Sequence, residues 1–473
     1  MNRKRKSYRK VRGGLQALRI FNTLSGKKEA FKPIDENSVR MYICGMTVYD
    51  DTHIGHARTF LSFDLIVRYL RNIGFKVTYV RNITDVDDKI ISRAKELNLD
   101  PTDLVQKYIN SMQEDFESLG MINPDLEPRA TENINSIISL IETLIDKGHA
   151  YEGDSDVYFS VESFKSYGKL SGRNLEDMLA GARVDIDVDK KNPSDFVLWK
   201  KDTEGIKWDS PWGLGRPGWH IECSAMSIDA LGETFDIHGG GSDLKFPHHE
   251  NEIAQSECVT GKDFAKIWMH TGSLRIDKEK MSKSLGNFVT VKESLENHSP
   301  EVLRLFLISS HYRSPLNYSD ESIEEAKSSL DRLYNSIEDL EYLSKESVKS
   351  EYSDKFHNAM QDDFNTPSAI SVLFEIARQV NSLKKDNEIE EATKLASELY
   401  DLSSILGLLQ QDPNDYFRDG INISESQIQS LIDKRNKARA EKDFTLSDKI
   451  RDDLLEMGIA LEDRNNETVW RKV

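Results

Sequence analysis

Cysteine is scarce in this chain, and long apolar runs are missing. The 473 residues include only three cysteines, which excludes a disulfide framework and is typical of proteins in the reducing cytoplasm. No apolar run approaches the roughly 18 residues that a membrane span needs. The basic start of the chain lacks the apolar core of a secretory signal. The sequence therefore predicts a cytoplasmic protein that does not enter a membrane.

Positive charge is also in deficit, because the formal net charge is −18. This argues against indiscriminate binding of nucleic acid but leaves room for a shaped RNA site, which depends on local charge. Residues 1–30 carry ten Lys or Arg and one acidic residue, and we interpret residues 1–17 as a solvated, basic extension. Residues 431–473 carry ten residues of each sign, so this end is neutral within an acidic chain.

The first part of the chain shows a strand–helix–strand pattern. Residues 39–47 are typical of a strand that runs into a loop, and residues 57–73 have apolar side chains at helical spacing before Gly74. Residues 76–83 are rich in β-branched and aromatic residues, as strands are. This order predicts a βαβ unit and hence an α/β fold with a parallel sheet. Ligands of such sheets bind beyond the carboxyl ends of the strands, where residues 53–56 fall.

The rest of the chain divides into helical and mixed regions. The patterns predict helices over 102–147, an insertion of short strands and turns over 150–212, renewed αβ character over 219–270, helices without strands over 300–410, a turn-rich linker over 411–424, and a small module with a long charged helix followed by short pieces over 425–473.

Two short strings carry most of the chemical information. The string His53-Ile54-Gly55-His56 stands where a loop enters a helix, and the N–H groups and positive dipole at such a helix start favour a phosphate. Gly55 leaves room for a flat base against the backbone. The string Lys280-Met281-Ser282-Lys283-Ser284 adds two cations far along the chain. Together the two histidines and two lysines can hold charge that grows on phosphate oxygens, which predicts attack on the α-phosphate of ATP.

Four further residues form a candidate metal site. Cys44 precedes the histidine string, Cys223 lies in the middle of the chain, and His248 and Glu252 share a helix face because they are four residues apart. Two thiolates, an imidazole and a carboxylate suit Zn²⁺.

Spacing alone leaves other interpretations of these residues open. A cysteine is often a small buried hydrophobe, which is what we expect of Cys258. His–Glu pairs four residues apart are often surface contacts, and His249 and Glu250 are rival ligands on other faces of the same helix.

A glycine-rich loop, Gly239-Gly240-Gly241-Ser242-Asp243, follows a predicted strand over residues 234–238. Glycine permits close approach of the backbone to a ligand, and Asp243 could accept hydrogen bonds from a ribose. The alternative is that the loop is only a turn.

Longer stretches around these motifs resemble a known family. MYICGMTVYDDTHIGH (41–56), PGWHIECSAM (217–226), DIHGGGSDLKFPHHENEIAQ (236–255) and KMSKSLGN (280–287) are similar to cysteinyl-tRNA synthetases, which are class I aminoacyl-tRNA synthetases. SPEVLRLFLISSHYRSPLNYS (299–319) resembles the entry of that family into its helical bundle. The resemblance covers the chain from about residue 18 to its end.

The resemblance implies a Rossmann-like catalytic domain with an insertion, a helical bundle and an anticodon-binding module. The implied parts are a basic extension (1–17), the first half of the catalytic domain (18–127), a connective insertion (128–212), the second half of the catalytic domain (213–270), a region with the lysine loop and tRNA stem contacts (271–320), the helical bundle (321–411) and the anticodon-binding module (412–473).

The resemblance also implies roles for individual residues. These are Cys44, Cys223, His248 and Glu252 as ligands of one Zn²⁺; Gly45, Thr47, Thr84, Trp219 and His238 in the amino-acid pocket; Gly55, Gly241, Asp243 and Lys283 at the nucleotide; and His53, His56, Lys280 and Lys283 in catalysis. The implied reaction joins L-cysteine to tRNA(Cys) through a cysteinyl adenylate, with Mg²⁺ arriving on ATP. The implied protein is a monomer.

Zinc is useful in such a site because serine differs from cysteine by one atom, and an apolar pocket separates such isosteres poorly. A zinc ion prefers a thiolate, so the metal can select cysteine without a separate editing site.

Two other functions fit parts of the sequence. A related ligase that joins cysteine to an amino-sugar uses the same chemistry but lacks the last module, and a non-catalytic relative would bind only zinc and RNA. In the last module, Arg464, Trp470 and Arg471 fit RNA contact. The full length of the chain and its intact histidine and lysine strings favour the tRNA ligase.

Overall fold

The computed structural model describes residues 17–173, 189–202, 205–281, 286–343, 350–418, 425–464 and 467–472. These residues fall into two compact units. The first unit contains the chain up to Leu330 together with 349–375 and 401–408, and the second contains 331–348, 376–400 and 409–473. Nearly all of the predicted basic extension lies outside the described residues. The seven parts expected from the sequence, and the boundaries between them, stay predictions.

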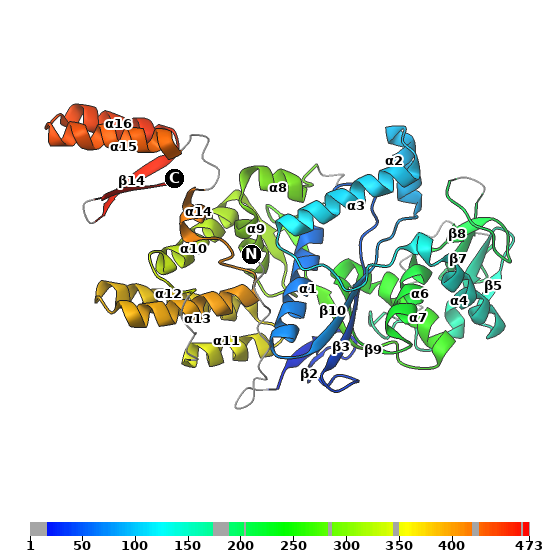
Figure 1. The fold of residues 1–473 in the computed structure, drawn as a ribbon. Coiled ribbons are helices and arrows are strands. Elements are labelled where there is room, and N and C mark those ends of the chain that lie inside the picture. The colour runs from blue at the N-terminus through cyan, green and yellow to red at the C-terminus, as the bar shows by residue number, and fades with distance from the viewer. Residues whose placement is uncertain are drawn as a thin grey trace. The chain divides into compact units, whose positions relative to one another are not determined.

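A four-stranded parallel sheet forms the centre of the first unit (Figure 1). Its strands lie in the order β10–β9–β3–β4. The second strand of this sheet along the chain, β4, lies on one side of β3, and the later strands β9 and β10 lie on the other side. All seven residues of β9 are buried, as expected of a strand with helices on both faces. The strands are β3 (Ser38–Ile43), β4 (Lys76–Arg81), β9 (Phe235–Gly241) and β10 (Ala265–Thr271).

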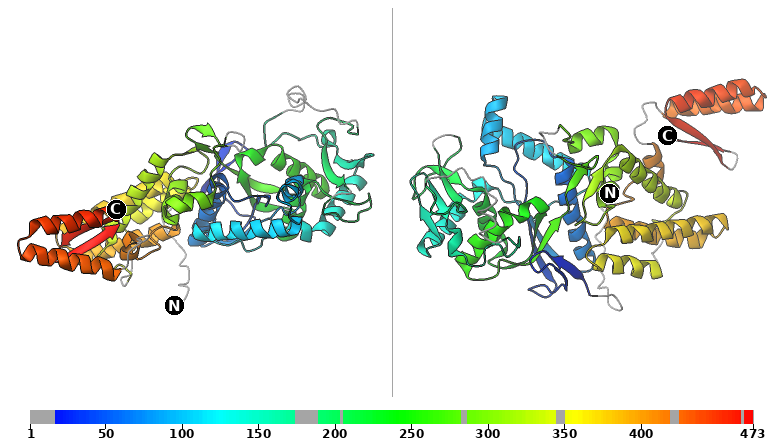
Figure 2. Two further views of the ribbon diagram at one scale, coloured as in Figure 1. Left: turned by 90° about the horizontal axis from the view of Figure 1, so that it is seen from above. Right: turned by 180° about the vertical axis from the view of Figure 1, so that it is seen from behind.

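Helices cover both faces of this sheet. The crossover from β3 to β4 is α1 (Ile54–Asn72), and the crossover from β9 to β10 contains α7 (His248–Thr260). The two crossovers run in opposite directions across the sheet, so their right-handedness places them on opposite faces. Figures 1 and 2 show α1 on one face and α7 with α6 (Trp219–Leu231) on the other. The predicted βαβ unit and fold class are confirmed, and a ligand crevice is expected between β3 and β9, where the order reverses.

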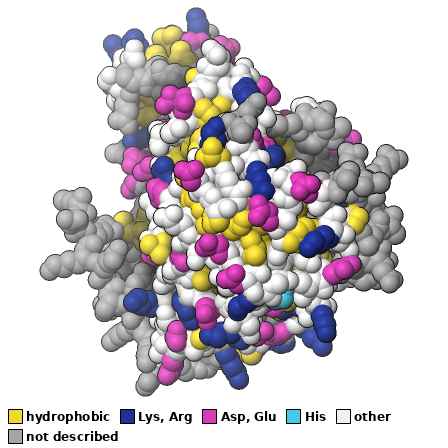
Figure 3. Space-filling view, turned by 90° about the vertical axis from the view of Figure 1, so that its right-hand side faces the viewer, with side chains coloured by type: hydrophobic (Ala, Val, Ile, Leu, Met, Phe, Trp, Pro, Cys, Tyr) yellow, Lys and Arg dark blue, Asp and Glu magenta, His cyan; other side chains and the backbone are white. Residues whose placement is uncertain are grey.

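An antiparallel sheet lies within the first unit, between β4 and α6 in the chain. Its strands lie in the order β5–β6–β7–β8, and its apolar core continues into Ile221 of α6 and Ala254 of α7. Figure 3, which looks onto this side, shows acidic and basic side chains interspersed around a central group of hydrophobic ones. The elements here are α2 (Asp88–Leu97), α3 (Pro101–Ser118), η1 (Ala130–Glu132), α4 (Ile134–Asp146), β5 (Ala150–Glu152), β6 (Asp156–Phe159), η2 (Val161–Ser163), β7 (Phe196–Lys201) and β8 (Gly215–Pro217).

The structure corrects two predicted helical regions. Residues 102–147 are not one helical stretch, because residues 119–129 run beside β4, where the Arg81 N–H donates to the Leu126 carbonyl at 3.1 Å. Pro124 and Pro128 lack the N–H that a helix interior needs, which explains the interruption. Residues 300–410 are not free of strands, because β13 (Leu316–Tyr318) pairs with β11 (Leu274–Ile276). Three residues are too few to show a period in sequence.

The remaining elements up to residue 405 are mostly helices. They are the hairpin β1 (Arg19–Asn22) and β2 (Lys27–Ala30), then η3 (Ser242–Lys245), β12 (Glu279–Lys280), α8 (Val291–Asn297), α9 (Pro300–Ile308), α10 (Asp320–Ile337), α11 (Glu351–Gln361), α12 (Thr366–Lys385) and α13 (Ile389–Ile405).

The last part of the second unit differs from its prediction. The linker contains a short helix, α14, and the expected long helix is two helices separated at Lys442, whose φ is +63°. Trp470 does not fit RNA contact, because it is only 8% exposed and packs with Ile428 and Leu454 in the core of the module. The side chains of Arg464 and Arg471 lie outside the described part. The elements are α14 (Pro413–Arg418), α15 (Glu425–Ala440), α16 (Phe444–Glu456), β14 (Ile459–Arg464) and β15 (Glu467–Lys472).

Among the helices that the structure describes, none is both long and apolar enough to cross a membrane.

Candidate active site and metal centre

The histidine string forms the entry to α1, beside the point where the strand order reverses. His53 is the N-cap of α1, and its Nδ1 accepts a hydrogen bond of 3.1 Å from the backbone N–H of His56. The two imidazole rings stack with their centroids 3.5 Å apart. Because Nδ1 of His53 accepts, the proton of the neutral ring is on Nε2, which is then a donor. The first turn of α1 has no acidic residue to oppose the attraction of the helix end for an anion.

The second string lies against the first. The Ile54 N–H donates to the Val289 carbonyl at 3.1 Å, and the Phe288 ring meets the His53 ring edge-on at 5.0 Å. Met281, inside the second string, would be 3.0 Å from a Cβ on Gly55. The fold therefore joins two motifs that are far apart in sequence.

The lysines of the second string are described only in part. The backbone of Lys280 belongs to β12, but its side chain is not described. Lys283 lies wholly outside the described residues.

A cavity of about 470 Å³ opens at the carboxyl ends of β3, β9 and β10. It contains most of the residues predicted for the amino acid and the nucleotide. The predicted residues that line it are Cys44, Gly45, Thr47, His53, Gly55, His56, Trp219, Gly241 and Asp243. Thr84 and His238, which were predicted for the amino-acid pocket, are buried and do not line it.

Two of the lining glycines leave little room for a side chain. A Cβ on Gly45 would lie 1.6 Å from the carbonyl oxygen of Asn82, whose Oδ1 accepts the Gly45 N–H at 2.8 Å. A Cβ on Gly241 would lie 2.4 Å from Oδ1 of Asp243. A larger residue at position 45 would displace backbone in the cavity wall, whereas one at position 241 would only turn the Asp243 side chain aside.

Cys44, Cys223, His248 and Glu252 converge beneath this cavity. Their donor atoms all lie within 4.8 Å of one another, and all four residues are buried. The two sulfurs are 3.7 Å apart. Glu252 Oε1 lies 3.2 Å from Cys44 Sγ and 3.1 Å from His248 Nε2. Two soft sulfurs with one nitrogen and one oxygen can hold a metal ion.

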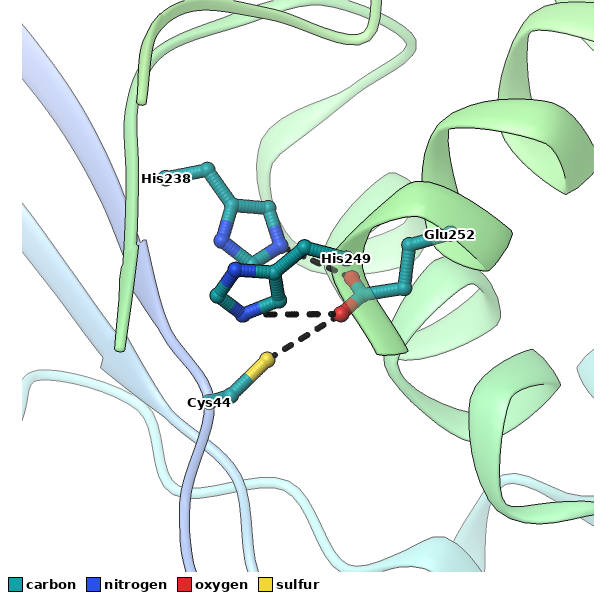
Figure 4. A group of neighbouring side chains, drawn as sticks. All are labelled: Cys44, His238, His249 and Glu252. Carbon is teal, nitrogen blue, oxygen red and sulfur yellow. Dashed lines mark hydrogen bonds and ion pairs between the residues drawn. The ribbon is translucent and has the colours of Figure 1, made fainter. Parts of the chain in front are cut away.

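A second group, Cys44, His238, His249 and Glu252, also lies within 4.8 Å (Figure 4). His238 Nε2 lies 2.8 Å from Oε2 of Glu252. His238 therefore contacts one carboxylate oxygen of Glu252, and His248 contacts the other. His249 Nε2 is 3.9 Å from Oε1, and its Nδ1 is 2.8 Å from Nε2 of His270. These contacts orient Glu252 from behind, as partners of metal ligands commonly do.

His248 is oriented by His220, which the sequence did not single out. Their Nδ1 atoms are 2.9 Å apart, and burial lowers the pKa of His220 to about 3. His220 is therefore neutral and accepts a hydrogen bond from the Nδ1–H of His248, which directs Nε2 of His248 towards the cluster.

The protonation of the cluster is tightly coupled. A hydrogen bond from Cys44 lowers the pKa of Cys223 to about 6, although burial opposes the change. Burial also opposes charge on His248, but Glu252 and Cys223 outweigh it and raise the pKa of His248 to about 10. Burial, Cys223 and Glu252 raise the pKa of Cys44. In the absence of a metal, protons on Cys44 and His248 balance the negative charge of Cys223 and Glu252. A divalent cation can replace these protons and balance the same charge.

The third cysteine and the rival acid have other contacts. Cys258 packs beside the core of the antiparallel sheet, in line with the expectation of a small hydrophobe. Glu250 accepts hydrogen bonds from the backbone N–H groups of Leu170 and Ser171, so it faces away from the cluster.

Sequence reasoning missed several residues of the cavity wall. Thr271, Gly272 and Ser273 line it at the end of β10 and directly after it, and Lys89 lines it from the start of α2. The position of residues 271–273 at the carboxyl end of a parallel strand was an available signal. No such signal was available for Lys89, because charged residues at helix starts are common on protein surfaces.

Comparison with known proteins bears on this architecture. The protein-family model described as tRNA synthetases class I (C) catalytic domain matches residues 30–328 of the sequence. A DALR domain matches residues 355–410, and the cysteinyl-tRNA ligase anticodon binding domain matches residues 425–471. A cysteine–tRNA ligase of Haemophilus influenzae (strain PittGG) is 54% identical over 458 residues, which are 96% of this chain and 100% of that protein.

The chain belongs to the cysteine–tRNA ligase family. A cysteine–tRNA ligase of Halorhodospira halophila is 55% identical over 96% of this chain and 99% of its own length. One of Coxiella burnetii (strain Dugway 5J108-111) is 53% identical over 96% and 100%. The family resemblance expected from the sequence is thus confirmed over nearly the whole chain.

Solved structures share the fold of this cysteine–tRNA ligase family member at low identity. A Mycobacterium tuberculosis methionyl-tRNA synthetase in complex with methionyl-adenylate has a TM-score of 0.58 and 14% identity, covering 78% of this chain and 89% of that one. An Agrobacterium radiobacter K84 LeuRS, in a ternary complex, has a TM-score of 0.57 and 11% identity, covering 85% and 93%. Both support the fold alone.

Proposed function

We propose that this chain is a cysteine–tRNA ligase that joins L-cysteine to tRNA(Cys) in two steps through a cysteinyl adenylate. ATP is consumed, and AMP and diphosphate are released. Identity above 50% over the full length of several cysteine–tRNA ligases supports this activity. The cavity that joins both signature strings supports it independently.

The observation that carries the proposal is the position of Cys44. This residue lines the cavity and also belongs to the buried cluster, whereas Cys223, His248 and Glu252 lie behind it. We assign these four residues as the metal ligands and His238, His249 and His220 as their supports. The donor set suits Zn²⁺, which when bound favours a substrate thiolate over a hydroxyl. A small thiol in the cavity can reach such a metal, which gives selection of cysteine over serine.

The first step needs the carboxylate of cysteine to attack the α-phosphate of ATP. The start of α1 presents the positive end of the helix dipole, and His53 and His56 stand beside it as donors to oxygens that gain charge in the transition state. Asp243 accepts hydrogen bonds from the ribose. We assign Lys280 and Lys283 to the departing diphosphate, and Mg²⁺ arrives on ATP as part of the substrate.

The second step transfers cysteine to the terminal adenosine of the tRNA. The domains matched over residues 355–410 and 425–471 are the parts we assign to tRNA binding. We retain a monomeric, cytoplasmic protein as part of the proposal.

The two alternatives are less well supported. An amino-sugar ligase has no use for an anticodon-binding domain, yet such a domain matches residues 425–471. A non-catalytic zinc- and RNA-binding protein has no use for the two stacked histidines in the cavity wall.

The test is diphosphate exchange into ATP with cysteine or serine, followed by charging of tRNA(Cys), before and after zinc removal. We expect exchange with cysteine only, loss of exchange without zinc, and recovery when zinc is restored. Exchange with cysteine followed by transfer to an amino-sugar instead of tRNA would support the first alternative. No exchange from a zinc-loaded protein would support the second.

A further inference from the structure

Asp363 is a buried carboxylate that joins three segments of the first unit. It lies in the turn between α11 and α12 and is 0% exposed. Its Oδ1 accepts hydrogen bonds of 2.8 Å from the Phe21 backbone N–H and from the Tyr312 hydroxyl. Its Oδ2 accepts from Nε and Nη2 of Arg313 at 2.8 and 2.7 Å. Both oxygens therefore hold neighbouring segments, namely β1 and the loop 311–314 after α9.

The backbone of this turn is held in an uncommon conformation. Asp363 and Phe364 have φ angles of +64° and +53°, in the left-handed region that is unfavourable for most side chains. The Asp363 N–H donates to the Arg19 carbonyl at 2.8 Å. Such a conformation persists only where the surroundings fix it, so Asp363 is held at both its backbone and its side chain.

The loop 311–314 reaches the wall of the cavity. The Tyr312 carbonyl accepts a hydrogen bond of 2.7 Å from the N–H of Gly272, which lines the cavity. A Cβ on Gly272 would lie 2.3 Å from the Ser314 carbonyl oxygen, so loop and wall are in direct contact. Tyr312 is thus anchored at its hydroxyl by Asp363 and at its carbonyl by the cavity wall.

The same loop holds the helix that carries the histidine string. Arg58 is buried on α1, two residues after His56. Its Nη2 donates to the His311 carbonyl at 2.8 Å and to Ser310 Oγ at 3.0 Å. A displacement of this loop would therefore move both the cavity wall and the start of α1.

We propose that Asp363 is a positioning residue for ATP. It fixes the loop 311–314, which in turn fixes Gly272 in the wall of the nucleotide cavity and Arg58 on the helix that carries the histidine string. The domain matched over residues 355–410 is thereby connected to the site of adenylation. This inference rests on the proposed function, because it assigns the cavity to ATP.

The decisive variant is Asp363→Asn. Asparagine tolerates a positive φ and keeps one acceptor oxygen, but its NH₂ group cannot accept from Arg313 or Tyr312. We expect the KM for ATP in cysteine-dependent diphosphate exchange to rise about tenfold, since small displacements at a reaction site cost rate and affinity. The KM for cysteine and the zinc content should stay close to those of the unmodified protein, whereas the melting temperature should fall, because the Arg313 and Tyr312 donors lose an acceptor.

Asp362→Asn is the matched control. Asp362 lies in the same turn as Asp363, and its side chain is 48% exposed. The substitution breaks an ion pair of 2.7 Å between Asp362 and Lys28. Its KM for ATP should not change. Tyr312→Phe removes only the hydroxyl, and we expect it to raise the same KM by a smaller factor.

Direct binding of ATP, measured by calorimetry without cysteine, gives the same comparison without turnover. A tenfold weaker Kd in Asp363→Asn supports the proposal. An unchanged Kd, or equal losses of ATP affinity, cysteine affinity and zinc, would overturn it and leave Asp363 with a purely structural role. Absence of exchange in the unmodified protein would contradict the proposed function, whereas the ATP binding comparison would still decide the role of Asp363.

Discussion

His53 accepts the backbone N–H of His56 through Nδ1, so the first histidine of the string caps the helix that carries the second. One side chain therefore has two tasks. Nδ1 stabilises the start of α1, and Nε2, which carries the proton of the neutral ring, can act as a donor in the cavity that His53 lines. The cap uses the backbone of His56, the third residue after the N-cap, which is within reach of an N-cap side chain.

The two tasks of His53 can be separated by substitution. His53→Ala removes both the cap and the donor, whereas His53→Asn keeps a good N-cap and lacks the Nε2 donor. We expect His53→Ala to lose about 1 kcal/mol of stability and His53→Asn to stay near the unmodified protein. Both should lower the rate of diphosphate exchange by about 100-fold, as loss of a transition-state donor does. Full exchange activity in a folded His53→Asn protein would show that His53 is only a cap.

Cys44 and Cys258 provide a matched pair for the metal centre. Cys44→Ser removes a sulfur from the buried cluster, whereas Cys258→Ser changes a cysteine that packs beside an apolar core. We expect about one zinc per chain in the unmodified protein and in Cys258→Ser, and a large loss in Cys44→Ser. Elemental analysis of the purified proteins measures this directly. Equal zinc contents in the two variants would remove Cys44 from the ligand set.

His248 and His249 distinguish the two overlapping groups of donors. His248→Ala removes a proposed ligand and should abolish tight zinc binding. His249→Ala removes a group that holds its neighbours from behind, and the loss of such a partner typically lowers metal affinity by about 10- to 100-fold. Competition with a zinc chelator measures both affinities. If His249→Ala were the more damaging change, the group of Cys44, His238, His249 and Glu252 would be the metal site.

Local patterns predicted the parts of the site that local structure determines. The spacing of His248 and Glu252 predicted a shared helix face, and α7 places their Nε2 and Oε1 atoms 3.1 Å apart. The strand and helix over residues 39–73 predicted the place of the histidine string at the end of a parallel strand. The assignment of the four metal ligands came from the family resemblance and not from spacing.

Other features depend on contacts that no local pattern carries. His238 lies in β9, whose seven residues are all buried, and nothing in its sequence position shows that it contacts Oε2 of Glu252. Trp470 occurs in a charged segment, yet it fills the core of the last module because that small domain has few apolar residues to bury. Asp363 is one of two adjacent acids, and only its three-dimensional neighbours distinguish it from Asp362.

The burial of Asp115 leads us to expect that part of the stability of the protein falls as pH rises. It lies on α3, is 6% exposed, and has its pKa raised to about 7 by burial and further by the nearby charge of Asp51. In the unfolded chain a carboxyl group has a pKa of about 3.9. Between these two values the unfolded chain loses its proton while the folded protein keeps it, so the contribution of Asp115 to stability falls as pH rises from about 4 to 7.

Asp115→Asn removes this titration, because an amide is neutral throughout. We expect the variant to match the unmodified protein near pH 4.5 and to be more stable at pH 8, by on the order of 1 kcal/mol or more. Thermal unfolding at both pH values measures the difference. Glu117→Gln, an exposed change on the same helix, should give the same small effect at either pH. A stability gain in Asp115→Asn that does not grow with pH would mean that the folded protein holds Asp115 ionised.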